Sequence, residues 1–296
     1  KEVAVQIEDA LAAFTTQLEA DGRSHHTIAQ YQRHVRALAT WLHHERHSAS
    51  LSEVVHEVLA RFLASTAART RPDGAAKKPG SANALRSSLK GFFSYVHRAG
   101  YTAQDATRLV RRARAQPPPP RGMSSAAQER LLASMEGEDG LEARRDSVLV
   151  RLMLATGLRL SSALALDVSD VELERGELRV RRLKGGGEQI MPLPSAMRER
   201  LAAYLGERIP GALFRGCTGR RLGNRQAQRR FAQWLERAGL SGRYSAHSLR
   251  HSFAMGLYAR TGDVLRVKEA LGHRSISSTL VYARCDRERL REAVGA

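Results

Sequence analysis

Two segments near the C-terminal end of the sequence carry side chains that could bind a phosphate group and attack it. In segment 247–251 (HSLRH), a helix would place His247 and Arg250 on one face, because the two lie three residues apart. A guanidinium binds two phosphate oxygens at once, and an imidazole exchanges a proton near neutral pH. His251 would point elsewhere, and we expect it to pack among its neighbours. A basic helix face with no chemical role is the alternative for this segment.

The second segment, 271–282 (LGHRSISSTLVY), contains a possible nucleophile. Gly272 ends a predicted helix, which places His273 in the turn after it, and Tyr282 falls in a short helical stretch predicted over 277–284. A phenol is a poor nucleophile at neutral pH, but cations beside it favour the phenolate and bind the phosphate that it attacks. For a lone tyrosine, the alternative is a core residue packed on its aliphatic neighbours.

Two further basic side chains occupy unusual surroundings. In segment 156–161 (TGLRLS), a helix breaks at Gly157 and delivers Arg159 from a turn. An arginine in such an apolar setting needs an anionic partner, which is either an internal carboxylate or the phosphate of a substrate. Lys184 stands in a glycine-rich hairpin (KGGG) and is one of six lysines among 48 basic residues. Because a lysine can release a proton at accessible pH and an arginine cannot, Lys184 is a candidate donor to a leaving oxygen; a solvated hairpin lysine is the alternative.

Together, and in this order, these motifs resemble those of the tyrosine recombinase family, also called the lambda-integrase or Xer-type family. The string 271–282 is the most specific match. The resemblance covers nearly the whole chain, because the N-terminal region is similar to the family's core-binding domain. It implies a catalytic set of six residues: Arg159, Lys184, His247, Arg250, His273 and Tyr282.

Each of these residues receives a role from the resemblance. The two arginines would clamp the scissile phosphate, the lysine would protonate the leaving 5′ oxygen, and Tyr282 would be the nucleophile. His247 would act as the acid or base of its motif, and His273 occupies the position where the family has a histidine or tryptophan that supports the phosphate. One position departs from the family pattern: Ser162 stands where a supporting carboxylate is usual.

The reaction that the resemblance implies is cleavage of a DNA strand through a 3′-phosphotyrosyl intermediate, followed by attack of a 5′ hydroxyl from a partner strand. The covalent link conserves the phosphodiester energy, so we expect neither ATP nor any other cofactor. We expect no metal either, since the Asp/Glu clusters of two-metal nucleases are not apparent in the sequence. Integration, excision and dimer resolution are all compatible uses. A type IB-like topoisomerase and a catalytically idle, sequence-specific DNA-binding protein are the alternatives.

The composition agrees with a nucleic-acid partner. The chain has 296 residues, with 48 Lys plus Arg against 30 Asp plus Glu, which gives a net charge of +18. Such a basic surface favours a polyanion, although an arginine-rich genome would also produce it. Residues 1–120 carry 17 basic and 10 acidic side chains, and residues 121–296 carry 31 and 20, so both parts are basic. Hydrophobic residues make up 42% of the chain, enough for a buried core.

Features of exported or membrane proteins are not apparent in the sequence. No apolar run reaches the roughly 18 residues that a membrane span requires. The N-terminus lacks the pattern of a signal peptide, and the two cysteines cannot build a disulfide scaffold. We therefore expect a bacterial-type cytoplasmic protein with reduced thiols, associated with the nucleoid when it is bound to DNA.

A proline-rich stretch divides the chain. Four consecutive prolines, residues 117–120, cannot lie inside a helix, and helical patterns stand on both sides of them. We therefore predict a helical core-type DNA-binding domain over 1–115, a linker over 116–124 and a catalytic domain over 125–296.

Apolar spacing predicts a mainly α-helical fold with a small antiparallel β-sheet in the C-terminal domain and a four-helix bundle in the N-terminal domain. The N-terminal helices are predicted over 3–20, 24–46, 52–69 and 81–98. In the C-terminal domain, strands are predicted over 178–183 and 189–193, and helices over 126–135, 143–156, 196–206, 223–238, 248–261, 264–271 and 277–284.

Side chains that grip DNA are expected on helices of both domains, with a solvated helix face as the alternative for each. On the helix before His247, the candidates for major-groove or phosphate contacts are Arg225, Gln226, Arg229 and Arg230. In the N-terminal domain, the candidates are Ser24, Thr27, Arg33, Arg86, Ser87 and Lys90. The expected partner is a double-stranded DNA recombination site. The resemblance further implies a homotetramer, or a related heterotetramer, on paired sites, with segment 283–296 docking on a neighbouring protomer.

Overall fold

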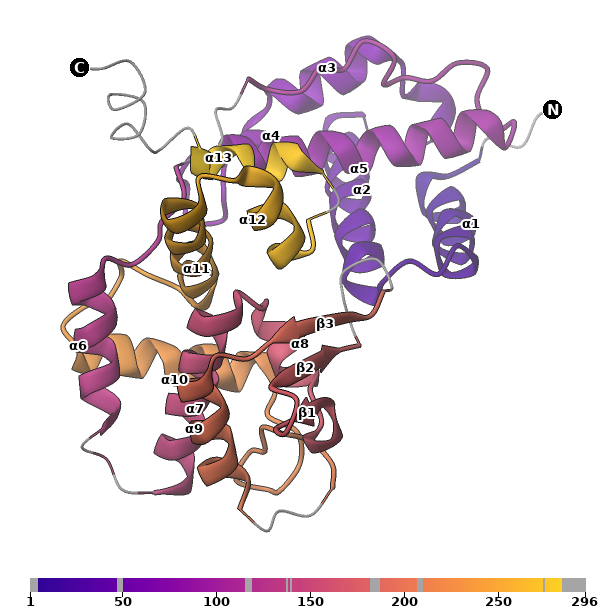
Figure 1. Ribbon diagram of the computed structural model, residues 1–296. Helices are drawn as coiled ribbons and strands as arrows, with labels where there is room; N and C mark the ends of the chain where they lie inside the picture. Colours follow the sequence, from indigo (N-terminus) through magenta and orange to yellow (C-terminus); the bar gives the residue numbers. More distant parts are fainter. Residues whose placement is uncertain are drawn as a thin grey trace. The chain divides into compact units, whose positions relative to one another are not determined.

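The computed structural model describes residues 5–46, 50–114, 119–136, 138, 140–181, 187–206, 210–273 and 275–283 (Figure 1). The chain falls into two compact units, Lys1–Gln116 and Pro117–Ala296, and the division lies at the start of the four prolines. The fold class is confirmed in outline, because both units are mainly helical and the small antiparallel sheet belongs to the second unit. No helix in these ranges has both the length and the apolar character to cross a membrane.

The N-terminal unit is a group of helices around one apolar core. Its described helices are α1 (Ile7–Ala20), α2 (His25–Arg46), α3 (His56–Ala64), α4 (Thr66–Arg69) and α5 (Pro79–Arg98). Helix α2 packs against α1 and α5, and the core between the helices combines aliphatic side chains with four buried aromatic rings, those of Phe14, Phe62, Phe92 and Phe93. Helix α5 begins at Pro79, because the missing N–H of a proline costs nothing at the start of a helix.

The helix predicted over 52–69 is interrupted, so this prediction is wrong in part. A 3₁₀ turn covers Leu51–Glu53, and Ser65 leaves the helical conformation with a ψ of 161° between α3 and α4. The Ser65 hydroxyl donates to the carbonyl of Phe62 at 2.7 Å, and such local bonds compete with continuation of a helix. Phe62 and Ala68 are buried on the two sides of the break, so apolar spacing alone predicts one helix.

The C-terminal unit combines helices with a three-stranded antiparallel sheet in the order β1-β2-β3. Its strands are β1 (Val171–Glu172), β2 (Glu177–Val180) and β3 (Gln189–Pro192), and its helices are α6 (Ser125–Glu136), α7 (Leu141–Thr156), α8 (Leu160–Ala165), α9 (Ser195–Leu205), α10 (Asn224–Arg237), α11 (Ala246–Thr261), α12 (Val264–Leu271) and α13 (Leu280–Ala283). The sequence pattern does not predict β1 and α8, because each is too short to show a period. Lys184 lies outside the described residues, as does segment 284–296.

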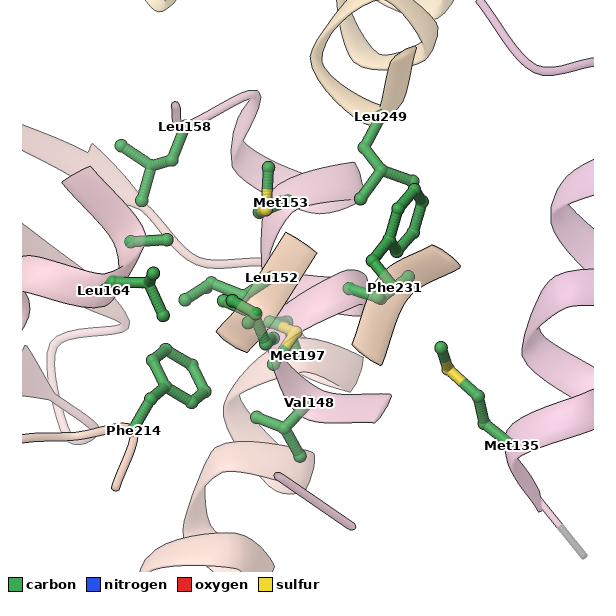
Figure 2. Packing of buried hydrophobic residues seen from close by; sticks show 14 of the residues in the cluster. Met135, Val148, Leu152, Met153, Leu158, Leu164, Met197, Phe214, Phe231 and Leu249 are labelled. Carbon is green, nitrogen blue, oxygen red and sulfur yellow. The ribbon is translucent and has the colours of Figure 1, made fainter. Parts of the chain in front are cut away.

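Helix α7 is buried on most of its circumference. Val148, Leu149, Val150, Leu152 and Met153 all belong to the core, and consecutive apolar residues of this kind cover more than one face of a helix. In Figure 2, the side chains of α7 lie among those of the surrounding helices, represented by Leu164, Met197, Phe231 and Leu249. Because α11 packs directly on α7, the core fixes the helix that carries the motif 247–251.

One buried carboxylate, that of Asp146 on α7, joins α7 to α10. It accepts hydrogen bonds from the Arg145 guanidinium at 2.7 and 2.9 Å and from the Trp234 indole N–H at 2.9 Å. The Arg230 guanidinium also pairs with Asp146, and it donates to Glu142 at 2.6 Å. Arg145 and Asp146 are only 3% and 4% exposed, so water solvates neither charge well. Each charge is therefore stabilised by its ion pair with the other.

The end of the proline-rich segment is bound to helix α11. The backbone N–H of Met123 donates to the Ser252 hydroxyl at 2.7 Å, and that hydroxyl donates to the carbonyl of Ser248 at 2.9 Å. Met123 is buried in the C-terminal core. Although 116–124 is predicted as a linker, its last residues therefore pack with the C-terminal unit; residues 116–118 lie outside the described ones.

We predict that Asp146→Asn lowers the free energy of unfolding of the C-terminal unit by about 3–5 kcal/mol, because it leaves the buried Arg145 charge without its partner. The matched control is Glu138→Gln, which removes the partner of Arg237 in an exposed ion pair and should cost at most about 1 kcal/mol. Urea unfolding followed by circular dichroism measures both values. Equally small losses in the two variants would contradict this account of Asp146.

Candidate active site

A reciprocal cap fixes the N-terminus of helix α11. The Ser245 hydroxyl accepts from the backbone N–H of Ser248, and the Ser248 hydroxyl accepts from the N–H of Ser245 at 3.1 Å. The helix therefore begins at Ala246, two residues before its predicted start, and both His247 and Arg250 are helical. Their three-residue spacing makes them neighbours on the helix surface.

The Arg250 side chain is buried and connects two other motifs. Its Nη1 donates to the carbonyl of Gly157 at 2.6 Å, and its Nη2 donates to the carbonyl of Leu271 at 2.7 Å. These carbonyls lie at the C-terminal ends of α7 and α12, where backbone acceptors lack partners within the helix and the helix dipole is negative. One guanidinium thus holds two helix ends together.

The turn that delivers Arg159 depends on Gly157. Gly157 has a φ of 66°, and a Cβ placed on it would lie 2.3 Å from Cδ1 of Phe253, so a larger residue would displace its surroundings. Arg159 follows in an extended conformation, as the N-cap of α8, and is partly exposed. Among the described residues, no carboxylate lies within ion-pair distance of Arg159 or Arg250. Within those residues, the internal carboxylate considered for Arg159 is not found, so neither guanidinium charge is compensated by a carboxylate there.

Tyr282 lies in the short helix α13, which packs against α11 and α12. Its side chain is 4% exposed, and its hydroxyl shares a hydrogen bond of 2.9 Å with Nδ1 of His251. The rings of His251 and His247 meet edge to face, with their centroids 4.6 Å apart. The expectation that His251 points elsewhere is therefore wrong. The signal that could have found it is its spacing of four residues from His247, which places the two rings on one helix face.

His273 lies in the turn after α12, as predicted. Gly272 ends that helix with a φ of 60°, and the N–H of His273 donates to the carbonyl of Lys268 at 3.0 Å. The His273 ring shares a hydrogen bond of 2.9 Å with the hydroxyl of Thr279, a fully buried residue. This bond fixes the orientation of the ring.

Burial and the positive charges of the site lower the pKa values of its histidines. Burial, followed by the charges of Arg250 and Arg159, lowers the pKa of His273 to about 4. Burial, with further contributions from His247 and Arg250, lowers the pKa of His251 to about 4 as well. The pKa of His247 is also lowered, by burial first and then by the two arginines. At pH 7 the imidazoles are therefore neutral groups beside two cations.

The phenol and the buried arginine respond to the same surroundings. Burial raises the pKa of Tyr282, while the charges of Arg250 and Arg159 act in the opposite direction. Burial and the charge of Arg159 lower the pKa of Arg250 to about 10, so this guanidinium stays protonated at neutral pH. The site offers fixed positive charge, neutral hydrogen-bonding rings and a protonated phenol, which suits the binding of an anion and its attack by the phenol oxygen.

The structure brings five of the six predicted catalytic residues into this site: Arg159, His247, Arg250, His273 and Tyr282. The sixth, Lys184, lies outside the described residues. Ser162, at the position where the resemblance leads one to expect a carboxylate, is buried on α8. Within the part of the chain that the structure describes, no cluster of His, Cys, Asp or Glu side chains is arranged to hold a metal ion.

The candidates for DNA contact on α10 fall into two groups. Arg225 and Arg229 are exposed, and Gln226 is partly buried. Arg230 is held by the carboxylates of Glu142 and Asp146, so the structure gives it a part in packing α10 on α7. Its predicted contact with DNA has no support from this placement.

The candidates in the N-terminal unit lie on α2 and α5 or at the start of α2. Ser24 caps α2, since the N–H of Thr27 donates to its hydroxyl at 3.3 Å. Arg86 and Lys90 each donate to a backbone carbonyl, at 3.2 Å in both cases. The remaining candidates, Arg33 and Ser87, are exposed. Their contacts with DNA stay predictions.

Comparison with known families and proteins gives matches along most of the chain. The model of the "Phage integrase family" matches residues 123–289, and that of the "Phage integrase, N-terminal SAM-like domain" matches residues 11–100. The tyrosine recombinase XerC of Chromobacterium violaceum is 31% identical over 288 residues, which cover 96% of this chain and 92% of that protein. The tyrosine recombinase XerD of Ralstonia nicotianae is 32% identical over 279 residues, covering 92% and 87%.

Solved structures share the fold. A XerH site-specific recombinase bound to a palindromic difH substrate, a post-cleavage complex, matches with a TM-score of 0.76 and 24% identity, covering 95% of this chain and 84% of that chain. A lambda integrase tetramer bound to a Holliday junction matches with a TM-score of 0.71 and 20% identity, covering 92% and 78%.

We predict that the free energy of unfolding of the C-terminal unit decreases as the pH falls from 7 to 5.5. His251 and His273 have folded-state pKa values of about 4 against an ordinary value of 6.5, so the unfolded state binds more protons in this window and gains stability as the pH falls. The double variant His251→Asn/His273→Asn should show a shallower pH dependence in urea unfolding. A variant of an exposed ring, His25→Asn, is the control and should leave the slope unchanged. Parallel curves for all three proteins would contradict the burial of neutral imidazoles.

Proposed function

This chain belongs to the phage integrase family of tyrosine recombinases. We propose that it cleaves and rejoins DNA with Lys184 and with the five side chains brought together in the candidate active site: Arg159, His247, Arg250, His273 and Tyr282. As a member of that family, the protein is a site-specific DNA recombinase. The observation that carries the assignment of residues is the buried Arg250 guanidinium, which is bound to two helix ends and has no carboxylate partner among the described residues. A cation fixed in this way is ready for a phosphodiester.

The proposed reaction begins when Arg250 and Arg159 bind the non-bridging oxygens of the scissile phosphate. Oη of Tyr282 then passes its proton to the neutral imidazole of His247 and bonds to phosphorus, the bond from phosphorus to the 5′ oxygen breaks, and a 3′-phosphotyrosyl link forms. The transition state carries more negative charge than the bound phosphate, so the preorganised cations stabilise it more strongly. A single such donor is typically worth about 3–4 kcal/mol.

The leaving 5′ oxygen needs a proton, and we assign that proton to Lys184. His247, which is neutral before the reaction, can exchange a proton near the phosphate. His273, oriented by Thr279, donates a hydrogen bond to a phosphate oxygen. Attack on the phosphotyrosyl link by a 5′ hydroxyl from another strand reverses these steps and joins the strands in exchanged order, without ATP.

We further propose that residues 1–115 form a DNA-binding domain, that 116–124 connects it to the rest and that 125–296 form the catalytic domain. Arg225 and Arg229 on α10 are the best placed of the predicted DNA contacts in the catalytic domain, since both side chains are exposed. Arg230 is left out of this set because two carboxylates already bind it. The expected place of action is the bacterial cytoplasm, on the nucleoid.

The proposed assembly is a tetramer on paired recombination sites. The lambda integrase of similar fold is a tetramer on a Holliday junction, which supports this proposal. Segment 283–296, the predicted docking element, lies outside the described residues apart from Ala283. A type IB-like topoisomerase would work as a monomer and relax supercoils without a site requirement, and an idle DNA-binding protein would form no covalent adduct.

We expect the protein to form a covalent adduct with DNA through Tyr282. The substrate is a nicked suicide duplex that carries the site selected by this protein from random duplex DNA, and the adduct is read on a denaturing gel. Tyr282→Phe should abolish the adduct and keep DNA binding. Lys184→Ala should slow its formation with little loss of binding. Equal loss of both activities in Lys184→Ala would reduce Lys184 to a phosphate contact, and an adduct in Tyr282→Phe would remove Tyr282 from the mechanism.

We expect DNA affinity to fall steeply with salt, because each phosphate contact releases a counterion. The variant Arg225→Gln/Arg229→Gln should lower the slope of log affinity against log salt by about 2, roughly one for each phosphate that is no longer neutralised. Arg237→Gln on the same helix is the matched control, since Arg237 is paired with Glu138. Fluorescence anisotropy at several salt concentrations measures the slopes. A slope unaffected by the double substitution would exclude α10 from the interface.

A further inference from the structure

The hydroxyl of Tyr282 has a partner whose role none of the proposed steps explains. His251 on α11 shares a 2.9 Å hydrogen bond with this hydroxyl through its Nδ1, and the centroids of the two rings are 5.7 Å apart. Among the described residues, the Tyr282 hydroxyl makes this hydrogen bond and no other. It joins α13 to the helix that carries the phosphate-binding Arg250.

Tyr282 belongs to a buried cluster with Ala254, Val267 and Leu271, but the short helix α13 itself gives the phenol oxygen little direction. It has four residues, hardly more than one turn, so its own backbone hydrogen bonds define the direction of the side chain poorly. A phenol has two rotatable side-chain bonds, and a displacement of the oxygen by one ångström is enough to cost a large part of a rate. The Tyr282 oxygen therefore needs a fixed reference point, and α11, which packs directly on α7, provides one.

His251 is itself held in place. The ring of His247 packs edge to face against it at 4.6 Å, and the two residues are four apart on one helix. The neutral ring, whose pKa is lowered to about 4, has one nitrogen that donates and one that accepts. It can therefore accept from the phenol or donate to the phenolate without bringing a further charge between Arg250 and the phosphate.

We propose that His251 is a positioning residue for strand cleavage, which holds the Tyr282 oxygen at the phosphate bound by Arg159 and Arg250. This inference rests on the proposed role of Tyr282 as the nucleophile. It assigns His251 to the attacking side of the reaction, whereas Lys184 acts on the leaving side. A substrate with a different leaving atom distinguishes a role in the attack from a role in protonating the leaving group.

The experiment compares three substitutions at one position in the full-length protein. His251→Leu removes the hydrogen bond, His251→Asn keeps a polar group near the place of Nδ1, and His251→Gln moves it towards the place of Nε2. Single-turnover cleavage of the suicide duplex is measured with saturating protein, so that DNA affinity does not enter the rate. Met255→Leu, one turn further along α11, is the matched control and should cleave at the rate of the unaltered protein.

We expect His251→Leu to slow cleavage by about 10- to 100-fold, as misplacement of a nucleophile does, with unchanged DNA affinity. His251→Asn should recover most of this rate, and His251→Gln should stay slow. A second substrate carries sulfur in place of the bridging 5′ oxygen, which leaves without a proton. On this substrate Lys184→Ala should recover and His251→Leu should not.

The outcomes separate the inference from the proposed function. If Tyr282→Phe forms no adduct while His251→Leu cleaves at the full rate, the positioning role is wrong and Tyr282 remains the nucleophile. An adduct in Tyr282→Phe would instead remove the proposed function. Recovery of His251→Leu on the sulfur substrate would move His251 to the leaving side and overturn the inference. If His251→Leu fails to fold, as thermal melting would show, equal rates for the Asn and Gln variants overturn it.

Discussion

The site depends on one buried cation that is hydrogen-bonded to backbone carbonyls and keeps its charge. Arg250 donates to the carbonyl of Gly157 and to that of Leu271, so the ends of α7 and α12 meet on the helix that carries the guanidinium. Three motifs that are far apart in the sequence are thereby assembled before any ligand arrives. A carboxylate in the same place would bind Arg250 as firmly, but it would cancel the charge that a phosphate needs.

The surroundings of Arg250 extend this arrangement. Burial and the charges of Arg250 and Arg159 lower the pKa values of His247 and His273, so the site combines an excess of positive charge with neutral imidazole rings. Such a site is electrostatically unfavourable when empty, because nothing acidic among the described residues compensates the two guanidinium groups. Binding of an anion relieves this repulsion, so part of the affinity for a phosphate comes from the empty site itself.

The motifs carried most of what could be predicted: Arg159 and His273 stand at a helix break and a turn that glycines indicate, and His247 and Arg250 have the spacing of one helix face. The misses arise where distant residues decide. Ser65 ends a helix that apolar spacing would continue, and Arg230 is recruited by a carboxylate 84 positions away along the chain. The spacing from His247 indicates the helix face on which His251 lies, but its partner Tyr282 belongs to another helix, which no local pattern shows. The hairpin around Lys184 lies outside the described residues, so its assignment depends on sequence.

The hydrogen bond between Met123 and Ser252 attaches the segment before α6 to helix α11. Ser252 is adjacent to His251, so the attachment point of Met123 lies beside the residue that contacts Tyr282. A displacement of Met123 is therefore transmitted to the middle of α11 before it reaches the rest of the C-terminal core.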